Sequence, residues 1–175
     1  MNIKKITTTA ILAAIICIIA PFSLPAGAIP ISLATFSIYL VACISGRNHT
    51  VIAVIIYILI GAAGLPVFSY FTGGLHKLTG LTGGYIIGYI PCAFIIATLT
   101  DRYPDKKYIY PASMALGTLI CYLVGTLWYM LQAECGFLTA VVTCIVPFAV
   151  GDIIKIAAAS CIGITLRKRL NRFIN

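Results

Sequence analysis

Charged residues are scarce in this sequence. Only 9% of its 175 residues are Asp, Glu, Lys or Arg, and only 4 of these are acidic, whereas 61% of the chain is hydrophobic. A soluble domain carries roughly a quarter charged residues, so this chain has too little polar surface to cover a water-soluble globule. The composition therefore predicts an integral membrane protein. Long apolar runs between glycine- and proline-bearing connections favour a helical bundle over a β-barrel, whose strands would alternate polar and apolar residues.

The sequence also lacks the motifs of several enzyme and binding classes. It has no GxxxxGK[ST] phosphate loop, so we do not expect it to hydrolyse ATP itself. Its 7 cysteines form no CxxC pair, and His49 and His76 have no paired ligand spacing, so neither a disulfide framework nor a metal site is expected. No Ser/His/Asp set converges in the outer region. An enzyme is therefore the weakest of the functional hypotheses.

Six membrane spans are predicted in a single integral membrane domain covering residues 1–175. Apolar runs long enough to approach the ~30 Å hydrocarbon core define them. The predicted spans lie at about residues 7–20, 31–45, 50–63, 84–100, 109–131 and 151–167, with an apolar approach segment at 137–146 before the last.

The distribution of basic residues between the two sides of the membrane tests this topology. With the N-terminus inside and six crossings, Lys77 is the single basic residue on the outside, and Lys155 lies within a span. The inside segments hold Lys4, Lys5, Arg47, Arg102, Lys106, Lys107, Arg167, Lys168, Arg169 and Arg172. Because cytoplasmic loops are enriched in Lys and Arg, the asymmetry predicts cytoplasmic termini and a multi-pass protein of the plasma membrane. It also accounts for the net charge of +8 without a nucleic-acid partner.

The N-terminal segment has the pattern of a cleavable signal peptide. Lys4 and Lys5 precede an apolar run at residues 6–20, and "PAGA" follows at residues 25–28. Because the rest of the chain is equally hydrophobic, an uncleaved first span is the simpler interpretation.

Small residues recur at four-residue spacing in three spans. The stripes are Ala10 and Ala14; Gly84 and Gly88; and Gly117, Cys121 and Gly125. In lipid, such stripes let helices approach closely. We interpret the last two as packing within the protein, whereas the first, beside two lysines, serves equally well as a docking face for a partner.

Asp152 and Lys155 are the only charged residues in the interior of the last span. At i, i+3 spacing they share one helix face, and each costs roughly 2.5–3.5 kcal/mol at mid-membrane. A purely structural salt bridge remains the alternative, but apolar replacement of such pairs is often neutral, which favours a function. Pro147 and Gly151 predict a helix start near Asp152, at the outer end of the span. The pair predicts a pocket for a small ligand with N–H donors at one end and an acid at the other.

A second candidate is "FTGGLHKLTGLTGGY", residues 71–85, which contains five glycines. A loop of this length is more often a lid or binding loop than a simple connector. Plain flexibility is the alternative interpretation.

Four segments resemble a known family, the biotin-specific substrate-binding component of energy-coupling factor transporters, called BioY. They are "IPISLATFSIYLVA" (29–42), "YILIGAAGLPVF" (57–68), "GGLHKLTGLTGGYIIGY" (73–89) and "PFAVGDIIK" (147–155). The last two are similar to the GPTGGY and PFxPGDxxK signatures of the family. Leu81 and Val150 stand where the family usually has proline, and Ala34 replaces a frequent glutamine. None of these departures removes the charged pair. They affect the expected shape of the glycine-rich loop and the expected set of polar side chains in the pocket.

The resemblance implies a six-helix fold of the S-component type that binds biotin from outside in an occluded pocket. Asp152 would accept hydrogen bonds from the ureido N–H groups of biotin, and Lys155 would meet its carboxylate. Tyr85, with Gly83 and Gly84, would form part of the pocket wall. The 71–80 loop, which contains Gly74, would be its lid.

The same resemblance implies partners. Ala10 and Ala14 are similar to the small-residue face by which such components dock on a transmembrane coupling subunit. A pair of separate ATPase subunits would supply the ATP hydrolysis, and no cofactor is expected beyond biotin as the transported ligand. The alternatives are a standalone, oligomeric secondary transporter that uses Asp152 as an ion site, and a non-transporting scaffold. Uptake that persists without ATPase and coupling subunits would indicate the first, and ligand binding by the purified protein would exclude the second.

Overall fold

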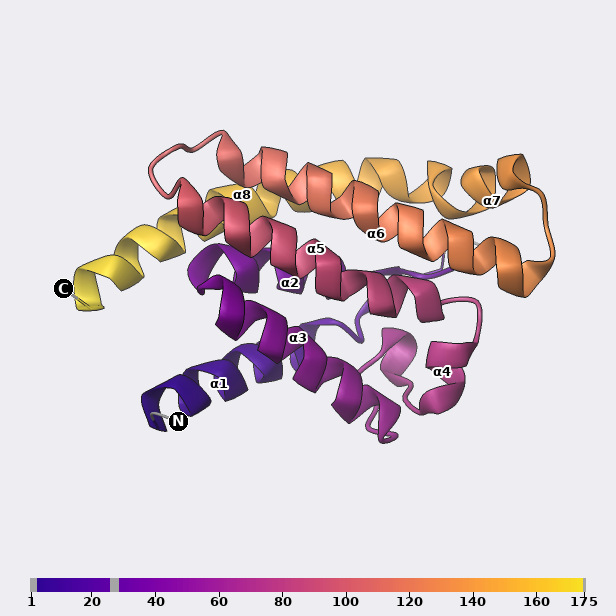
Figure 1. The fold of residues 1–175 in the computed structure, drawn as a ribbon, viewed down its shortest axis with the longest axis horizontal. Coiled ribbons are helices and arrows are strands. Elements are labelled where there is room, and N and C mark those ends of the chain that lie inside the picture. Colours follow the sequence, from indigo (N-terminus) through magenta and orange to yellow (C-terminus); the bar gives the residue numbers. More distant parts are fainter. Residues whose placement is uncertain (1–2, 26–28, 175) are drawn as a thin grey trace.

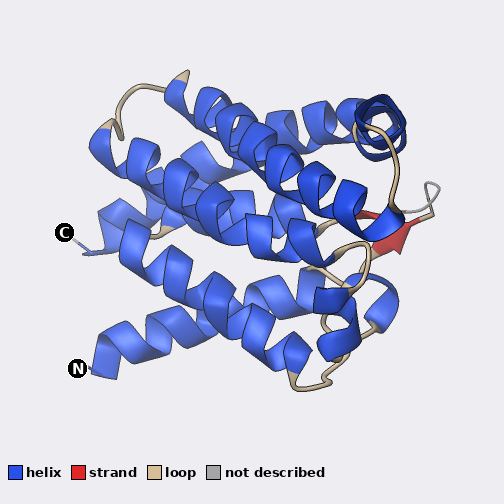
Figure 2. Cartoon of the chain, turned by 45° about the vertical axis from the view of Figure 1, so that its right-hand side comes forward, coloured by secondary structure: helices blue, strands red, loops and turns tan. Residues whose placement is uncertain are grey.

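The chain folds into a helical bundle, shown in Figures 1 and 2. The computed structural model describes residues 3–25 and 29–174, with side chains described up to residue 169. Residues 26–28, where the sequence has the pattern of a cleavage site, lie outside the described part. Within it, the helices are α1 (Ile3–Ile19), α2 (Ala34–Ile44), α3 (Arg47–Ala62), α4 (Leu75–Thr79), α5 (Gly83–Arg102), α6 (Ile109–Ala133), α7 (Phe137–Cys144) and α8 (Val146–Ile174).

Six of these helices correspond to the six predicted spans, namely α1, α2, α3, α5, α6 and α8. Helices α5, α6 and α8 are long and apolar enough to cross a membrane, and α2 and α3 are shorter apolar helices. A helical membrane protein is therefore confirmed, whereas the crossing of all six helices stays a prediction. Figure 1 places the first and last helices with their free ends at the same end of the bundle, as an even number of crossings requires.

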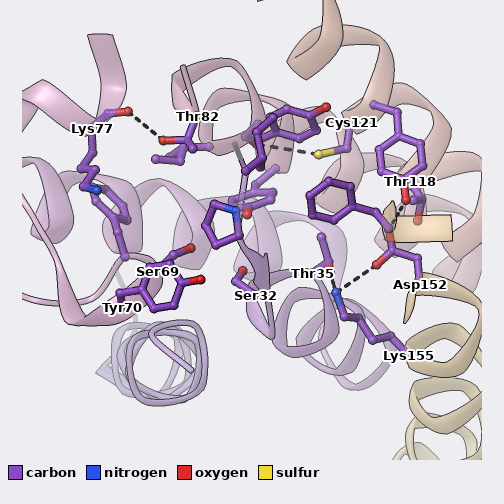
Figure 3. Close-up of a pocket in the computed structure, with 18 of the residues that line it drawn as sticks. Ser32, Thr35, Ser69, Tyr70, Lys77, Thr82, Thr118, Cys121, Asp152 and Lys155 are labelled. Carbon is purple, nitrogen blue, oxygen red and sulfur yellow. Dashed lines mark hydrogen bonds and ion pairs between the residues drawn. The ribbon is translucent and has the colours of Figure 1, made fainter. Parts of the chain in front are cut away.

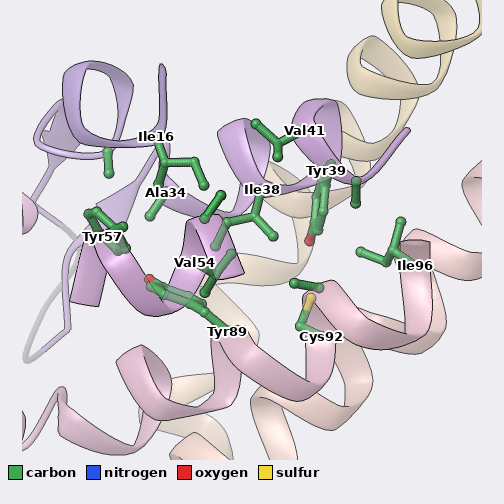
Figure 4. Packing of buried hydrophobic residues seen from close by; sticks show 14 of the residues in the cluster. Ile16, Ala34, Ile38, Tyr39, Val41, Val54, Tyr57, Tyr89, Cys92 and Ile96 are labelled. Carbon is green, nitrogen blue, oxygen red and sulfur yellow. The ribbon is translucent and has the colours of Figure 1, made fainter. Parts of the chain in front are cut away.

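Helix α2 lies at the centre of the bundle. It contacts α1, α3, α5 and α8, and seven of its 11 residues are buried. Figure 4 shows Ile38 and Tyr39 of α2 within the buried cluster, facing Val54 of α3 and Cys92 of α5. A helix that is apolar on all sides is stable either inside a protein core or in lipid, and the contacts of α2 place it in the core. The Tyr39 hydroxyl is satisfied by a 2.5 Å hydrogen bond with Thr118 Oγ1.

Helices α5 and α6 pack along each other through their small-residue stripes. A Cβ atom at Gly84 would lie 2.2 Å from Trp128 Cβ, and one at Gly125 would lie 2.5 Å from the Tyr85 ring. Gly88 likewise approaches Cys121. The interpretation of both stripes as internal packing is therefore confirmed.

Helix α5 contains Pro91 near its midpoint. Proline has no N–H to donate to the carbonyl of the preceding turn, which weakens the helix there. Beyond it, Thr100 Oγ1 donates to the Ala42 carbonyl of α2 at 3.1 Å. The Asp101 carboxylate accepts the Arg47 N–H at the start of α3 at 2.8 Å and pairs with Arg167 of α8 at 3.0 Å. The C-terminal half of α5 is thus fastened to three other helices.

Helix α8 begins at Val146, and the prediction of a start near Asp152 is wrong. Pro147 is the second residue of the helix, where its missing N–H costs nothing because first-turn N–H groups have no acceptor within the helix. Gly151 continues the helix without a break. Asp152 therefore lies in the second turn, and the approach segment forms the separate helix α7.

Two segments that the sequence did not predict in this form cover the end of the bundle away from the termini. One is an antiparallel ribbon of β1 (Ser23–Leu24) and β2 (Ile31–Ser32). The other follows α3 and contains the short 3₁₀ helix η1 (Ser69–Phe71) and then α4.

The two covering segments are tied to each other. The Tyr70 N–H donates to the Pro21 carbonyl at 2.9 Å, and Phe71 packs edge-on against Phe22 with ring centroids 5.4 Å apart. Tyr70 has a φ of 60°, which is uncommon for a bulky residue. The turn around it persists because these contacts and the Phe68–Thr72 bridge hold both of its sides.

Candidate functional site

A cavity of about 260 Å³ lies beneath the two covering segments (Figure 3). Its lining comes from the ribbon, the loop after α3, and helices α2, α3, α4, α5, α6 and α8. The volume lies just below the ~300–1,000 Å³ typical of small-molecule sites. The site can therefore enclose one small molecule.

Asp152 and Lys155 form an ion pair in the cavity wall. Lys155 Nζ lies 3.0 Å from Asp152 Oδ1, and the two residues are only 9% and 5% exposed, respectively. The prediction that the two charges share one helix face is confirmed. Two residues from distant segments complete the group. The Tyr122 hydroxyl of α6 donates to Asp152 Oδ2, and Lys155 Nζ donates to Thr35 Oγ1 of α2 at 3.4 Å.

This group is electrically neutral, and each carboxylate oxygen and the ammonium has a hydrogen-bond partner, which is what a pair buried in an apolar helix requires. The carboxylate offers acceptors for ligand N–H groups, and the ammonium offers donors for ligand oxygens. Both kinds of group stand at the same end of the cavity, as Figure 3 shows.

Tyr85 is the third predicted site residue that lines the cavity. It occupies the first turn of α5, and its hydroxyl contacts Thr126 Oγ1 at 3.3 Å and the Cys144 carbonyl at 3.4 Å. Gly125 leaves the space that the ring fills. Tyr57 and Tyr89 add further aromatic surface to the same wall.

The three predicted glycines are not among the described residues that line the cavity. A Cβ at Gly83 would meet the Leu78 carbonyl at 1.8 Å, and Gly84 lies against Trp128. Gly74 has a φ of 105° and precedes α4, a backbone conformation that favours glycine. In this structure the three shape the backbone around the cavity. Contact of any of them with a ligand stays a prediction.

Sequence reasoning missed Tyr122, Thr35 and Ser32, all of which line the cavity. Tyr122 and Thr118 are four residues apart on α6, so both face the bundle interior. That spacing of polar residues in an apolar helix was a usable signal. No comparable pattern marked Thr35 or Ser32, because the ribbon and the start of α2 bring them to the site only in the folded chain.

The predicted lid contains ordered structure over the cavity. Thr72 and Lys77 from this segment, residues 71–80, line the cavity, as do Tyr70 just before it and Thr82 just after it. Trp128 of α6 donates through Nε1 to the Gly80 carbonyl at 2.9 Å, which ties the end of the segment to the bundle. Movement of this segment on ligand entry stays a prediction.

Ala10 and Ala14 lie on the outer face of α1. Both are exposed, whereas Leu12, Ala13 and Ile16 on the opposite face are buried against the bundle. The described residues thus leave this small-residue stripe uncovered, unlike the stripes of α5 and α6.

Comparison with known proteins agrees with this architecture. The chain is 34% identical over 165 residues to "Biotin transporter BioY" of Thermotoga maritima, which covers 94% of this chain and 96% of that protein. It is 35% identical over 159 residues to "Probable biotin transporter BioY" of Pyrococcus horikoshii, covering 91% and 93%.

A solved structure shares the fold. It is that of the S-component for biotin from an ECF-type ABC transporter, which matches with a TM-score of 0.87 and 26% identity over 95% of this chain and 92% of that chain. The family model of BioY matches residues 1–172. A match over nearly the whole chain, in sequence and in fold, shows that this protein belongs to the BioY family.

Proposed function

We propose that this protein captures biotin outside the cell and delivers it across the plasma membrane as the substrate-binding component of an energy-coupling factor transporter. The observation that carries the proposal is the cavity with the Asp152–Lys155 pair in its wall, in a fold that matches the biotin S-component with a TM-score of 0.87.

The chemistry of the cavity suits this ligand. Biotin carries a cyclic urea, which has N–H donors and a carbonyl acceptor, on fused rings that are mostly apolar. The Asp152 carboxylate is placed to accept the urea N–H groups, and Tyr122 and Lys155 hold that carboxylate in position. The rings of Tyr57, Tyr85 and Tyr89 offer flat apolar surface to the fused rings. The pairing of Lys155 with the ligand carboxylate, expected from the sequence, stays a prediction.

Energy for transport comes from partners in this proposal. The family is one of transporters and not of enzymes, and the sequence has no phosphate loop. The exposed Ala10/Ala14 stripe supports docking of α1 on a transmembrane coupling subunit, because small side chains let two helices approach closely in lipid. A pair of separate ATPase subunits would then hydrolyse ATP.

Titration of the detergent-solubilised protein with biotin tests the proposal. We expect tight binding by the wild type and a large loss in Asp152→Asn, because the substitution removes the charge that accepts the urea N–H groups. Lys155→Ala is expected to lose affinity as strongly, since it leaves a buried carboxylate unpaired. Isothermal titration calorimetry gives the dissociation constants. Failure of the wild type to bind biotin would refute the function, and unchanged affinity in both variants would refute the site.

A further inference from the structure

The ion pair in the cavity leaves one end of the proposed ligand without a partner. Asp152 and Lys155 are in contact at 3.0 Å on one face of α8. In biotin, fused rings and an alkyl chain separate the urea from the carboxylate. Two side chains in contact at one end of a cavity cannot both meet groups at the two ends of an extended ligand. A second cation must therefore be sought elsewhere in the lining.

Lys77 of α4 is the further cation among the described residues of the lining. It lines the same cavity and is half-buried, and Figure 3 shows it on the opposite side of the lining from Asp152 and Lys155. Among the described residues, Lys77 has no carboxylate within ion-pair distance. The charged residues of the lining are Lys77, Asp152 and Lys155, so the neutral pair leaves a surplus of one positive charge, located at Lys77.

The sequence gives an independent reason to single out Lys77. It is the one basic residue that the predicted topology leaves outside, against ten inside. The bias that accounts for the other basic residues therefore does not account for this one.

We propose that Lys77 binds the carboxylate of the ligand, while Asp152 and Lys155 together bind the urea at the other end. In this arrangement the Lys155 ammonium donates to the urea carbonyl, and the adjacent Asp152 accepts from the urea N–H groups. The inference rests on biotin as the ligand and deepens that proposal by assigning the partner of the acid group.

The position of Lys77 also links ligand charge to the covering segment. Helix α4 is only five residues long and lies between Gly74 and Gly80, so it is attached to the bundle through conformationally permissive residues. In this arrangement an anion bound to Lys77 adds a contact that holds α4 against the rest of the lining, and a neutral ligand does not supply it.

The test compares biotin with its methyl ester, which keeps the urea and rings but lacks the charge. Calorimetric titration of the purified protein is run with both compounds on the wild type, Lys77→Gln and Lys155→Gln. We expect the wild type to prefer biotin by about ten- to a hundredfold, the range of a hydrogen bond to a charged group. Lys77→Gln should weaken biotin binding to the level of the ester and leave ester affinity nearly unchanged. Lys155→Gln should weaken both compounds alike.

The matched control is His76→Gln, an exposed neighbour on the same short helix that does not line the cavity; it should keep the preference for the acid. The inference would be overturned if Lys77→Gln kept the wild-type preference for biotin over the ester and Lys155→Gln lost it. That result would assign the ligand carboxylate to Lys155 and leave the proposed function intact. Absence of biotin binding by the wild type would overturn both. A wild type that binds acid and ester equally would refute any cationic carboxylate partner.

Discussion

At the scale of single residues, the main feature is that each carboxylate oxygen of Asp152 already accepts one hydrogen bond before any ligand arrives. One oxygen accepts from Lys155 and the other from Tyr122. Such a carboxylate is held in a fixed position, so little reorganisation is needed when N–H groups of a ligand approach its remaining lone pairs.

Tyr122→Phe tests this role. The substitution keeps the ring in the wall but removes the donor to Asp152, so we expect a lower apparent melting temperature of the empty protein, corresponding to a loss of about 1–3 kcal/mol. Biotin affinity should fall by less than in Asp152→Asn, because the charge itself remains. Thermal unfolding in detergent and calorimetry measure the two effects.

Tyr108→Phe is the matched control, because Tyr108 is 63% exposed and its hydroxyl has no hydrogen-bond partner among the described residues. It should leave both quantities unchanged. A Tyr122→Phe protein that melts and binds like the wild type would show that the contact does not hold Asp152.

The sequence was sufficient to find the charged pair but not its surroundings. Two opposite charges in an apolar helix are conspicuous because each is costly there. Tyr122 and Thr35 are 30 and 120 residues away from their partners, and their residue types are common in membrane helices. Only the packing of α2 and α6 against α8 shows that they belong to the site.

At the scale of secondary-structure elements, the close contact between α5 and α6 positions one wall of the cavity. Both helices have glycines where they meet, and the Tyr85 ring of α5 occupies the space over Gly125 of α6. Loss of this approach would move Tyr85 away from the cavity as well as loosen the helix pair.

Gly84→Ala is expected to destabilise the protein by about 1–3 kcal/mol, because its Cβ would lie 2.2 Å from Trp128 Cβ and force the helices apart. The apparent melting temperature in detergent checks this. Gly136→Ala, where an added Cβ meets nothing within 4 Å, is the control. Loss of biotin affinity in Gly84→Ala at unchanged stability would instead favour the predicted contact with the ligand.

Element positions were predictable where apolar runs were long, as in α5 and α6, whose predicted bounds fall within two residues of the observed ones. Prediction of helix bounds was poorer where a proline or glycine fits equally well just before a helix and in its first turns. The sequence predicts Pro147 before the last helix, whereas it lies in the first turn, a position that tolerates proline equally well. The β1–β2 ribbon has strands of two residues each, too short for an alternating pattern to stand out.

At the scale of the whole molecule, the two functions proposed for the chain lie in different parts of the bundle. The cavity lies between the covering segments and the central helices, whereas the Ala10/Ala14 stripe lies on the outer face of α1. Neither Ala10 nor Ala14 lines the cavity. Capture and energised release can therefore be altered separately.

Ala10→Leu and Ala14→Leu should leave biotin affinity unchanged and lower biotin uptake by cells severalfold, because a bulky side chain prevents close approach of a partner helix. Uptake of labelled biotin is compared with calorimetry on the same variants. Ala157→Leu, an equally bulky change at an exposed position of α8, serves as the control and should spare both. Normal uptake by both α1 variants would place the docking face elsewhere.

The proline in α5 has a mechanical consequence. Tyr85 and Tyr89 precede Pro91 and line the cavity, whereas Thr100 and Asp101 follow it and anchor the other half to neighbouring helices. A helix bends most easily where a hydrogen bond of its ladder is missing. Helix α5 is therefore most easily bent at Pro91, which separates the half that lines the cavity from the half that is anchored to neighbouring helices.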